Sequence, residues 1–260
     1  MVNMIRSPLS DEYEPMNDPY YRSGLALIHH LAYGGHGDRI APGVLSLLAP
    51  VLRRDGLVVE LGCGSGALTR HLVGAGHRVL ATDASPAFVE LGAKTVPGAR
   101  FELLTLPDDP IPDADAIVAA GHVFNYLPDP HTVDQALVAV AGALRPGGVM
   151  VVDLLTAVGA PEPGEPSTHA RVEDEWAMMV TVSRTAPDRL VRRITTFVES
   201  EGRWDRDDEI HENLLTDSGR LPGLFDPDSY RVTVSDDLGG SPLPEGMVGL
   251  VVVRENTTEG

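Results

Sequence analysis

The stretch LVVELGCGSG at residues 57–66 decides the fold of this chain. A short apolar run ends in the carboxylate of Glu60 and is followed by three alternating glycines. Glycines let the backbone turn tightly and approach a bulky ligand without a Cβ in the way. Residues 67–72 then continue with helical spacing. The stretch therefore predicts a strand, a nucleotide-binding turn and a helix.

A second predicted strand, at residues 78–83, also ends in a carboxylate, that of Asp83. A doubly wound sheet uses an acid at this point to bind the two hydroxyls of a ribose, so we expect that role for Asp83, with Ala84 beside it. Glu60, at the end of a buried strand, needs a hydrogen-bond donor from the loop or the ligand. Gly62 and Gly64, with an alanine three residues on, also match the dinucleotide fingerprint G-x-G-x-x-G/A, which leaves a nicotinamide or flavin open.

The residues around this loop resemble the class I S-adenosylmethionine-dependent methyltransferases. Residues 58–66 are similar to the family's first motif, Asp83 to its ribose-binding acid, and residues 144–153 to its turn into the fifth strand. The three motifs follow the family's order within residues 50–155. The resemblance implies S-adenosyl-L-methionine as cofactor and S-adenosyl-L-homocysteine as product.

The pattern along the chain predicts an α/β fold. Further strands are expected at 99–104, 114–120 and 149–154, with a helix at 132–144, which requires a parallel sheet with right-handed crossovers. After a loop at 155–169, three stretches alternate with strand period and predict an antiparallel insertion: 175–184, 190–199 and 203–215. The last two core strands are expected at 230–234 and 247–253.

We thus expect a doubly wound, seven-stranded, mostly parallel sheet with helices on both faces, plus a three-stranded antiparallel insertion and an N-terminal helical cap. The chain is read as a single methyltransferase domain, 1–260, in four parts. These are an arm and helical cap (1–52), a cofactor-binding core (53–154), an insertion over the substrate site (155–215) and the C-terminal end of the core sheet (216–260). In the cap, Leu25, Ile28 and Leu31 fall on one helical face, and a second helix is expected from Pro42.

Ligands bind such sheets where strand order reverses, here between the first and fourth strands. The segment leaving the fourth strand supplies Ala120 for the cofactor and His122 and Tyr126 near the reacting atoms. Methyl transfer requires that the acceptor atom, the methyl carbon and the sulfur lie in line, and it often requires removal of a proton from the acceptor. His122, His211 and Tyr126 are therefore the candidates for a base, although each is also compatible with a purely structural role.

The residues expected at the adenine end and at the amino-acid end of the cofactor follow the family pattern less closely than the glycine loop does. Many family members place an Asp after the third strand for the adenine, whereas this chain offers Thr105 and Leu106. Tyr21 belongs to a group that either forms a lid over the cofactor's amino-acid end or packs the cap: Tyr20, Tyr21, Tyr33 and His36. The acidic run at 205–209 is interpreted as a solvated face, so no metal is expected.

Composition narrows the function classes. The formal net charge is −18, from 20 basic and 38 acidic side chains, which disfavours nucleic acid as a partner. One cysteine, Cys63, permits no internal disulfide, and no signal peptide or apolar run of ~20 residues is present, so we expect a cytoplasmic protein without a membrane partner. The oligomeric state stays open and includes a homodimer.

The expected function is methyl transfer from S-adenosylmethionine to an oxygen or nitrogen of a small-molecule metabolite. Sugar N-methyltransferases of secondary metabolism have a similar layout, but Tyr126 stands where some of them carry a histidine. Two alternatives remain: a protein that binds S-adenosylmethionine without transferring its methyl group, and a nicotinamide-dependent oxidoreductase.

Overall fold

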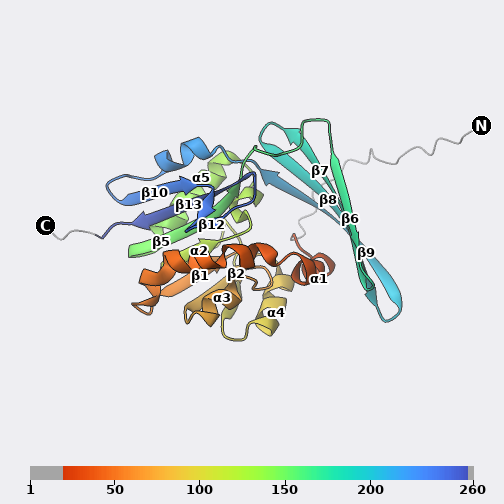
Figure 1. The fold of residues 1–260 in the computed structure, drawn as a ribbon, viewed down its shortest axis with the longest axis horizontal. Coiled ribbons are helices and arrows are strands. Elements are labelled where there is room, and N and C mark those ends of the chain that lie inside the picture. The colour runs from red at the N-terminus through yellow and green to blue at the C-terminus, as the bar shows by residue number, and fades with distance from the viewer. Residues whose placement is uncertain (1–19, 257–260) are drawn as a thin grey trace, which may run out of the picture.

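The computed structural model describes residues 20–256, so residues 1–19 of the expected arm lie outside the described part of the chain. A seven-stranded sheet has the order β10-β13-β5-β4-β1-β2-β3, and a separate antiparallel sheet has the order β6-β7-β8-β9 (Figure 1). The expected fold class is confirmed. The antiparallel sheet contains four strands, however, where three were predicted.

The parallel part of the large sheet consists of β1 (Leu57–Leu61), β2 (Arg78–Asp83), β3 (Arg100–Leu103), β4 (Ala114–Ala119) and β5 (Leu144–Leu155). β13 (Met247–Arg254) runs antiparallel to β5 and to β10 (Tyr230–Ser235). Two short strands, β11 (Asp237–Leu238) and β12 (Ser241–Pro242), form a separate ladder. Because β1 pairs in parallel with both β2 and β4, strand order reverses beside the glycine loop, as predicted.

Helices cover both faces of the large sheet. α2 (Gly35–Leu52) and α3 (Thr69–Gly74) contribute to one apolar cluster, in which Ile40 and Leu72 pack with Val58 and Val118 of the sheet. α5 (Pro130–Gly142) contributes to the cluster that includes Ile117 on the opposite face. α2 begins seven residues before the predicted Pro42, because the apolar helical face continues through Ile40, and a proline removes only one hydrogen bond.

The remaining helical elements join the layers. α4 (Pro86–Thr95) follows β2, and its N-terminus is capped by the Ser85 hydroxyl, which accepts the Phe88 N–H. Short 3-10 helices lie at Val123–Tyr126 (η1) and Ser218–Leu224 (η2). No helix within residues 20–256 combines the length and apolarity needed to cross a membrane.

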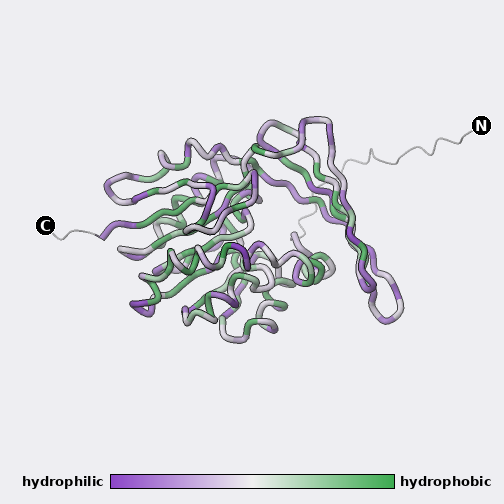
Figure 2. The backbone as a smooth tube through the Cα atoms, in the orientation of Figure 1, coloured by the Kyte–Doolittle hydropathy of each residue, from purple (hydrophilic) through white to green (hydrophobic). Residues whose placement is uncertain are grey.

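The smaller sheet comprises β6 (Ser167–Val172), β7 (Trp176–Ala186), β8 (Arg189–Ser200) and β9 (Arg203–Leu214). The last three match the predicted strands. β6 falls partly in the predicted loop because all six of its side chains are exposed, which leaves no alternating apolar face to recognise. Figure 2 shows that the hairpin tip between β8 and β9 is hydrophilic, in contrast to the apolar strands of the large sheet.

α1 (Ser23–Ala32) joins the N-terminal cap to the smaller sheet. Leu25 and Ile28 are buried in a cluster with Trp176, Met178 and Ile194 of β7 and β8. Leu31, predicted on the same face, is 57% exposed, because it lies in the last turn, away from the strands. This packing holds the smaller sheet above the C-terminal ends of the parallel strands (Figure 1).

Candidate functional site

A cavity of about 800 Å³ lies at the point where strand order reverses, between the ends of β1, β2 and β4 and the edge strand β9. Tyr20 and Tyr21 line it from the N-terminal side, and Glu209 and Ile210 line it from β9. Eight of the nine residues predicted to bind a cofactor line this cavity: Tyr21, Gly62, Gly64, Asp83, Ala84, Thr105, Leu106 and Ala120. The sequence motifs therefore converge on one cavity.

The glycine loop needs its glycines for two different reasons. Gly62 and Gly64 both have left-handed backbones, with φ of +64° and +55°. A Cβ at Gly62 would lie 2.4 Å from Cγ2 of Val123, so the protein's own packing excludes it. A Cβ at Gly64 would meet only the Phe88 ring, at 3.9 Å. Gly64 thus leaves space on the cavity side, where a ligand can approach the backbone.

Asp83 presents its carboxylate at the cavity wall. Oδ2 accepts the Gly64 N–H at 2.8 Å, and Oδ1 accepts the Ser85 N–H at 2.8 Å. Burial raises the pKa of the carboxyl to about 6, although the backbone donors oppose the shift. The side chain is therefore held rigidly, with lone pairs in reach of hydroxyl donors in the cavity.

Glu60 is the one predicted cofactor residue that does not line the cavity. It is only 2% exposed, and its Oε2 accepts the Thr69 hydroxyl of α3 at 2.7 Å. Burial raises its pKa to about 8. The expected donor thus comes from the start of the following helix, and Glu60 supports the loop from behind.

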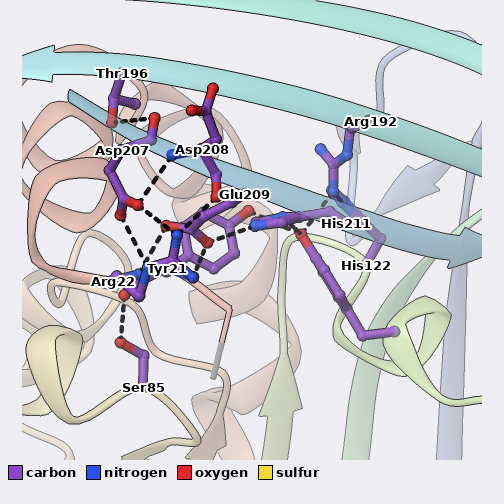
Figure 3. A network of polar contacts seen from close by, with 11 residues as sticks. Tyr21, Arg22, Ser85, His122, Arg192, Thr196, Asp207, Asp208, Glu209 and His211 are labelled. Carbon is purple, nitrogen blue, oxygen red and sulfur yellow. Dashed lines mark hydrogen bonds and ion pairs between the residues drawn. The ribbon is translucent and has the colours of Figure 1, made fainter. Parts of the chain in front are cut away.

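Tyr21, which lines the cavity, and the adjacent Arg22 contact Glu209 of β9 and Ser85 before α4 (Figure 3). The Tyr21 N–H donates to Glu209 Oε2 at 2.7 Å, and its carbonyl accepts the Ser85 hydroxyl at 2.8 Å. The Arg22 N–H donates to the other oxygen of Glu209 at 2.9 Å. Glu209 on β9 and Ser85 before α4 thereby fix the segment from both sides.

The other two residues proposed for the lid lie elsewhere. Tyr33 stacks on His29 at the end of α1, with ring centroids 6.2 Å apart. His36 on α2 pairs with the buried Asp153 of β5 at 2.6 Å. Asp153 also accepts the backbone N–H of His122 at 2.6 Å, so this pair orients the turn after β4.

All three candidates for the base lie within one polar cluster, which consists of His122, Tyr126, Arg192, Glu209 and His211. The Tyr126 hydroxyl lies 3.3 Å from His211 Nδ1 and 2.6 Å from Nη2 of Arg192. His122 stacks on the Tyr126 ring, with planes 13° apart. Tyr126 and Glu209 line the cavity, whereas neither histidine does.

Burial controls the protonation states in this polar cluster. It lowers the pKa of His211 and holds that of His122 well below the usual range, and the Arg192 charge adds to both shifts. It raises the pKa of Tyr126 well above its ordinary value, although Arg192 opposes this. At neutral pH both imidazoles are therefore neutral and can accept a proton, while the phenol keeps its own.

Two residues of the polar cluster, Arg192 and Glu209, were not identified from the sequence. Glu209 belongs to the acidic run interpreted as a solvated face, yet it is 5% exposed. That interpretation holds for Asp208, which is exposed, and is wrong for Glu209, because neighbouring side chains of β9 point to opposite faces. Arg192 shares a face of β8 with the buried Ile194, and that register is the signal that could have found it.

The described residues contain no group of three or more His, Cys, Asp or Glu side chains arranged to hold a metal ion. The polar cluster offers two neutral imidazoles, a phenol, a guanidinium and the carboxylate of Glu209, and Asp83 adds a second carboxylate on the cavity wall.

Comparison with known proteins gives these features a family context. Residues 59–150 match the methyltransferase domain family. The chain is 31% identical to the tRNA U34 carboxymethyltransferase of Cellvibrio japonicus, over 54% of this chain and 44% of the relative. It is 32% identical to glycine N-methyltransferase of Rattus norvegicus, over 54% of each. The chain thus spans about half of the length of these curated relatives.

Solved structures extend the likeness to almost the whole chain. An S-adenosylmethionine-dependent methyltransferase from Clostridium acetobutylicum superimposes with a TM-score of 0.73 and 16% identity, covering 89% of this chain and 98% of that one. The sugar N-methyltransferase KedS8 from Streptoalloteichus sp. gives 0.71 and 16%, covering 97% and 99%. Residues 59–150 thus resemble a methyltransferase domain, and the chain has the fold of the class I S-adenosylmethionine-dependent methyltransferases.

Proposed function

We propose that this protein is an enzyme that transfers a methyl group from S-adenosylmethionine to a nitrogen or oxygen of a small-molecule metabolite. The observation that carries the proposal is the shared cavity. The glycine loop and Asp83 line one part of it, and Tyr126 lines another. A methyl donor and a proton acceptor are thereby brought to the same space.

The cavity suits the cofactor in shape and in donor chemistry. Asp83 would accept hydrogen bonds from the ribose hydroxyls, Gly64 would leave room for the backbone to approach, and Thr105 and Leu106 would contact the adenine. Ala120 and Tyr21 would lie at the amino-acid end. The bound cofactor supplies an electrophilic methyl group on a sulfonium, and the chain supplies alignment with the acceptor.

The acceptor is proposed to be a metabolite because the cavity is closed by β9 and the N-terminal segment. The proposal assigns residues 53–154 to the cofactor, 155–215 to the acceptor, 216–260 to the end of the core sheet and 1–52 to the cap. A neighbour in fold is named as a sugar N-methyltransferase, which supports an amine or hydroxyl acceptor. The sole cysteine is compatible with the reducing cytoplasm.

A proton must leave an ammonium or hydroxyl acceptor during transfer. Tyr126, His211 and His122 are the proposed candidates to receive it, because Tyr126 lines the cavity, both imidazoles contact Tyr126 from behind, and both are neutral at pH 7. Alignment by the cavity walls accounts for the rest of the rate.

Calorimetric titration of the purified chain with S-adenosylhomocysteine, NAD and NADP tests the cofactor. Binding of the first alone supports the proposal, and binding of a nicotinamide alone overturns it in favour of an oxidoreductase. A panel of small amines and alcohols, followed by mass spectrometry for S-adenosylhomocysteine formation, tests the transfer. A panel with no turnover, despite tight cofactor binding, favours a protein that binds S-adenosylmethionine without using it.

A further inference from the structure

Elementary chemistry fixes the hydrogen-bond directions around Tyr126. A guanidinium only donates, so the Tyr126 oxygen accepts from Nη2 of Arg192 at 2.6 Å, and Nε2 of His122 accepts from the same group at 3.3 Å. His122 Nε2 therefore carries no proton. The lone pair that a base would use is already directed at Arg192.

The bonds to Glu209 fix the other imidazole. Its two carboxylate oxygens accept the backbone N–H groups of Tyr21 and Arg22, so Glu209 acts as an acceptor toward His211 Nε2 as well, at 2.8 Å. A neutral His211 then carries its proton on Nε2 and a lone pair on Nδ1. The Tyr126 hydroxyl, 3.3 Å away, is the donor to that lone pair.

Tyr126 lies between the cavity and His211, so the direction of its hydrogen bond determines where a proton from the cavity can go. Its side chain lines the cavity, whereas His211 is 0% exposed and lies behind it. The Tyr21 hydroxyl, 2.9 Å from the Tyr126 oxygen, occupies the second lone pair of that oxygen in the free protein, so the N–H or O–H of an acceptor has to displace it to reach Tyr126. A proton released in the cavity can thus reach His211 through the Tyr126 oxygen.

We propose that Tyr126 takes the proton from the acceptor's N–H or O–H and passes its own proton to Nδ1 of His211, whose imidazolium is held by Glu209. This relay rests on the proposed methyl transfer. As the acceptor's lone pair forms the new bond to carbon, the C–S bond breaks and sulfur keeps that electron pair. The acceptor's proton moves to the Tyr126 oxygen, so the positive charge of the sulfonium ends on His211.

Arg192 is the electrostatic partner of the relay. Its guanidinium lies 5.7 Å from the centre of the Tyr126 ring and forms no ion pair with a carboxylate within residues 20–256. Its Nε is shielded from solvent and has no hydrogen-bond partner there. An unneutralised guanidinium beside a phenol stabilises negative charge on the phenol oxygen during proton exchange.

Several charged or titratable groups face His211 and set its proton affinity. They come from its own strand, from β8, from the turn after β4 and from the N-terminal segment with α1: Glu209, Arg192, His122, Tyr126, Tyr20, Tyr21, Arg22 and His29. Only the carboxylate of Glu209 among these favours the imidazolium, so its loss should make His211 a weaker base.

The first experiment reads the proton positions directly and needs no acceptor. Long-range ¹H–¹⁵N spectra of the full chain with S-adenosylhomocysteine should show His211 protonated on Nε2 and His122 on Nδ1. Tyr126→Phe should shift the Nδ1 resonance of His211, whereas Tyr230→Phe, on the distant strand β10, should leave it in place. A His211 protonated on Nδ1 overturns the relay, because that atom could not receive a proton.

The second experiment measures turnover with an acceptor from the panel. Tyr126→Phe and His211→Gln should lower kcat by ~10²–10⁴ while the Kd for S-adenosylhomocysteine changes less than two-fold. Arg192→Met should also lower kcat, and Arg192→Lys, which keeps the charge, should recover part of the loss. Arg193→Met, on the exposed face of the same strand, is the matched control and should behave as wild type.

The pH profile separates the relay from a structural role. Wild-type kcat should fall on the acid side as His211 becomes protonated, below its ordinary pKa of about 6.5 because burial lowers that value. Glu209→Gln should move this limb further to the acid side, and His211→Gln should abolish it. Near-normal kcat in Tyr126→Phe overturns the relay. A wild-type chain that binds no S-adenosylmethionine overturns the proposed function instead.

Discussion

At the residue scale, the ribose contact proposed for Asp83 comes with a cost in stability. Its folded-state pKa is raised from 3.8 to about 6 by burial. The stabilisation from the protonated form is therefore present below pH 3.8 and is lost as the pH rises through about 6. The hydroxyls of a ribose would donate to the ionised carboxylate of Asp83. The ionised form that favours binding is therefore the form that lowers the stability of the free protein.

We therefore predict that the Kd for S-adenosylhomocysteine rises as the pH falls below about 6, since protonation of Asp83 removes an acceptor. Asp83→Asn should bind at least ten-fold more weakly at pH 8, because two charge-assisted hydrogen bonds are worth ~1.5–3 kcal/mol each. In the same variant the amide NH2 faces a backbone N–H that Asp83 accepts, so its melting temperature at pH 8 reports this lost bond together with the removed charge. Calorimetry and thermal melts check both, with Glu90→Gln on the exposed side of α4 as the control. An unchanged Kd would exclude Asp83 from the ribose contact.

A second residue-scale prediction concerns Glu60, whose pKa is raised to about 8 by the same physical cause. Wild-type stability should decline as the pH rises from 4.5 through 8, and Glu60→Gln, a neutral isostere, should remove that decline. Denaturant unfolding at pH 6 and pH 8.5 measures it. If the two proteins show the same pH dependence, Glu60 is ionised throughout and has a partner beyond Thr69.

At the element scale, the turn between β1 and α3 contains two glycines with different constraints. Gly64→Ala should fold, at a cost of about 1–2 kcal/mol for a left-handed backbone, and should lose cofactor binding if the ligand approaches there. Gly62→Ala should destabilise the fold itself, because its Cβ would lie 2.4 Å from a methyl of Val123. Melting temperature and S-adenosylhomocysteine affinity, measured for both variants, separate the two effects. Normal binding by Gly64→Ala would place the cofactor away from this loop.

The packing of α1 on the smaller sheet gives a matched pair of substitutions. Ile28 is 0% exposed among β7 and β8 side chains, so Ile28→Ala should cost ~2–5 kcal/mol and loosen the N-terminal segment over the cavity. The adjacent Leu27 is 37% exposed, and Leu27→Ala should be nearly neutral. Denaturant unfolding and hydrogen exchange of residues 20–33 check the pair; equal losses in both would mean that α1 is not held by this sheet.

More of the fold than of the polar cluster could be predicted from the sequence, and the strands of the smaller sheet show why. β7, β8 and β9 were predictable because apolar and polar side chains alternate and turn residues separate them, whereas β6 has no apolar face. The glycine loop and Asp83 follow a local pattern, so their place on the cavity wall was predictable too. Arg192 and Glu209 act through partners 66 and 188 residues away in sequence, and no local pattern encodes such contacts.

At the scale of the whole molecule, both sheets contribute residues to the walls of the site. The large sheet supplies the glycine loop and Asp83, and the smaller sheet supplies Glu209, His211 and Arg192. Glu209 bonds both the N-terminal segment and His211, so closure of the cap and orientation of the imidazole are linked. A site divided in this way can retain its cofactor contacts while the inserted sheet adapts to different acceptors.

The net charge of the whole chain favours a metabolite over a nucleic acid as the proposed acceptor. One relative is named as a tRNA-modifying enzyme, yet this chain carries 38 acidic and 20 basic side chains, and a phosphate backbone is bound by releasing counterions to Lys and Arg. We predict that fluorescein-labelled tRNA shows no change in anisotropy at 50 mM salt with up to 10 μM protein, where a nucleic-acid enzyme would bind. Radiolabelled methyl groups should enter acid-soluble products when a cell metabolite extract is supplied, and not acid-precipitable RNA. Repulsion between the acidic protein and the phosphate backbone weakens as salt is added, so binding that appears only above 50 mM salt would not be electrostatic. Labelling of RNA at low or high salt would replace the metabolite acceptor by a polymer.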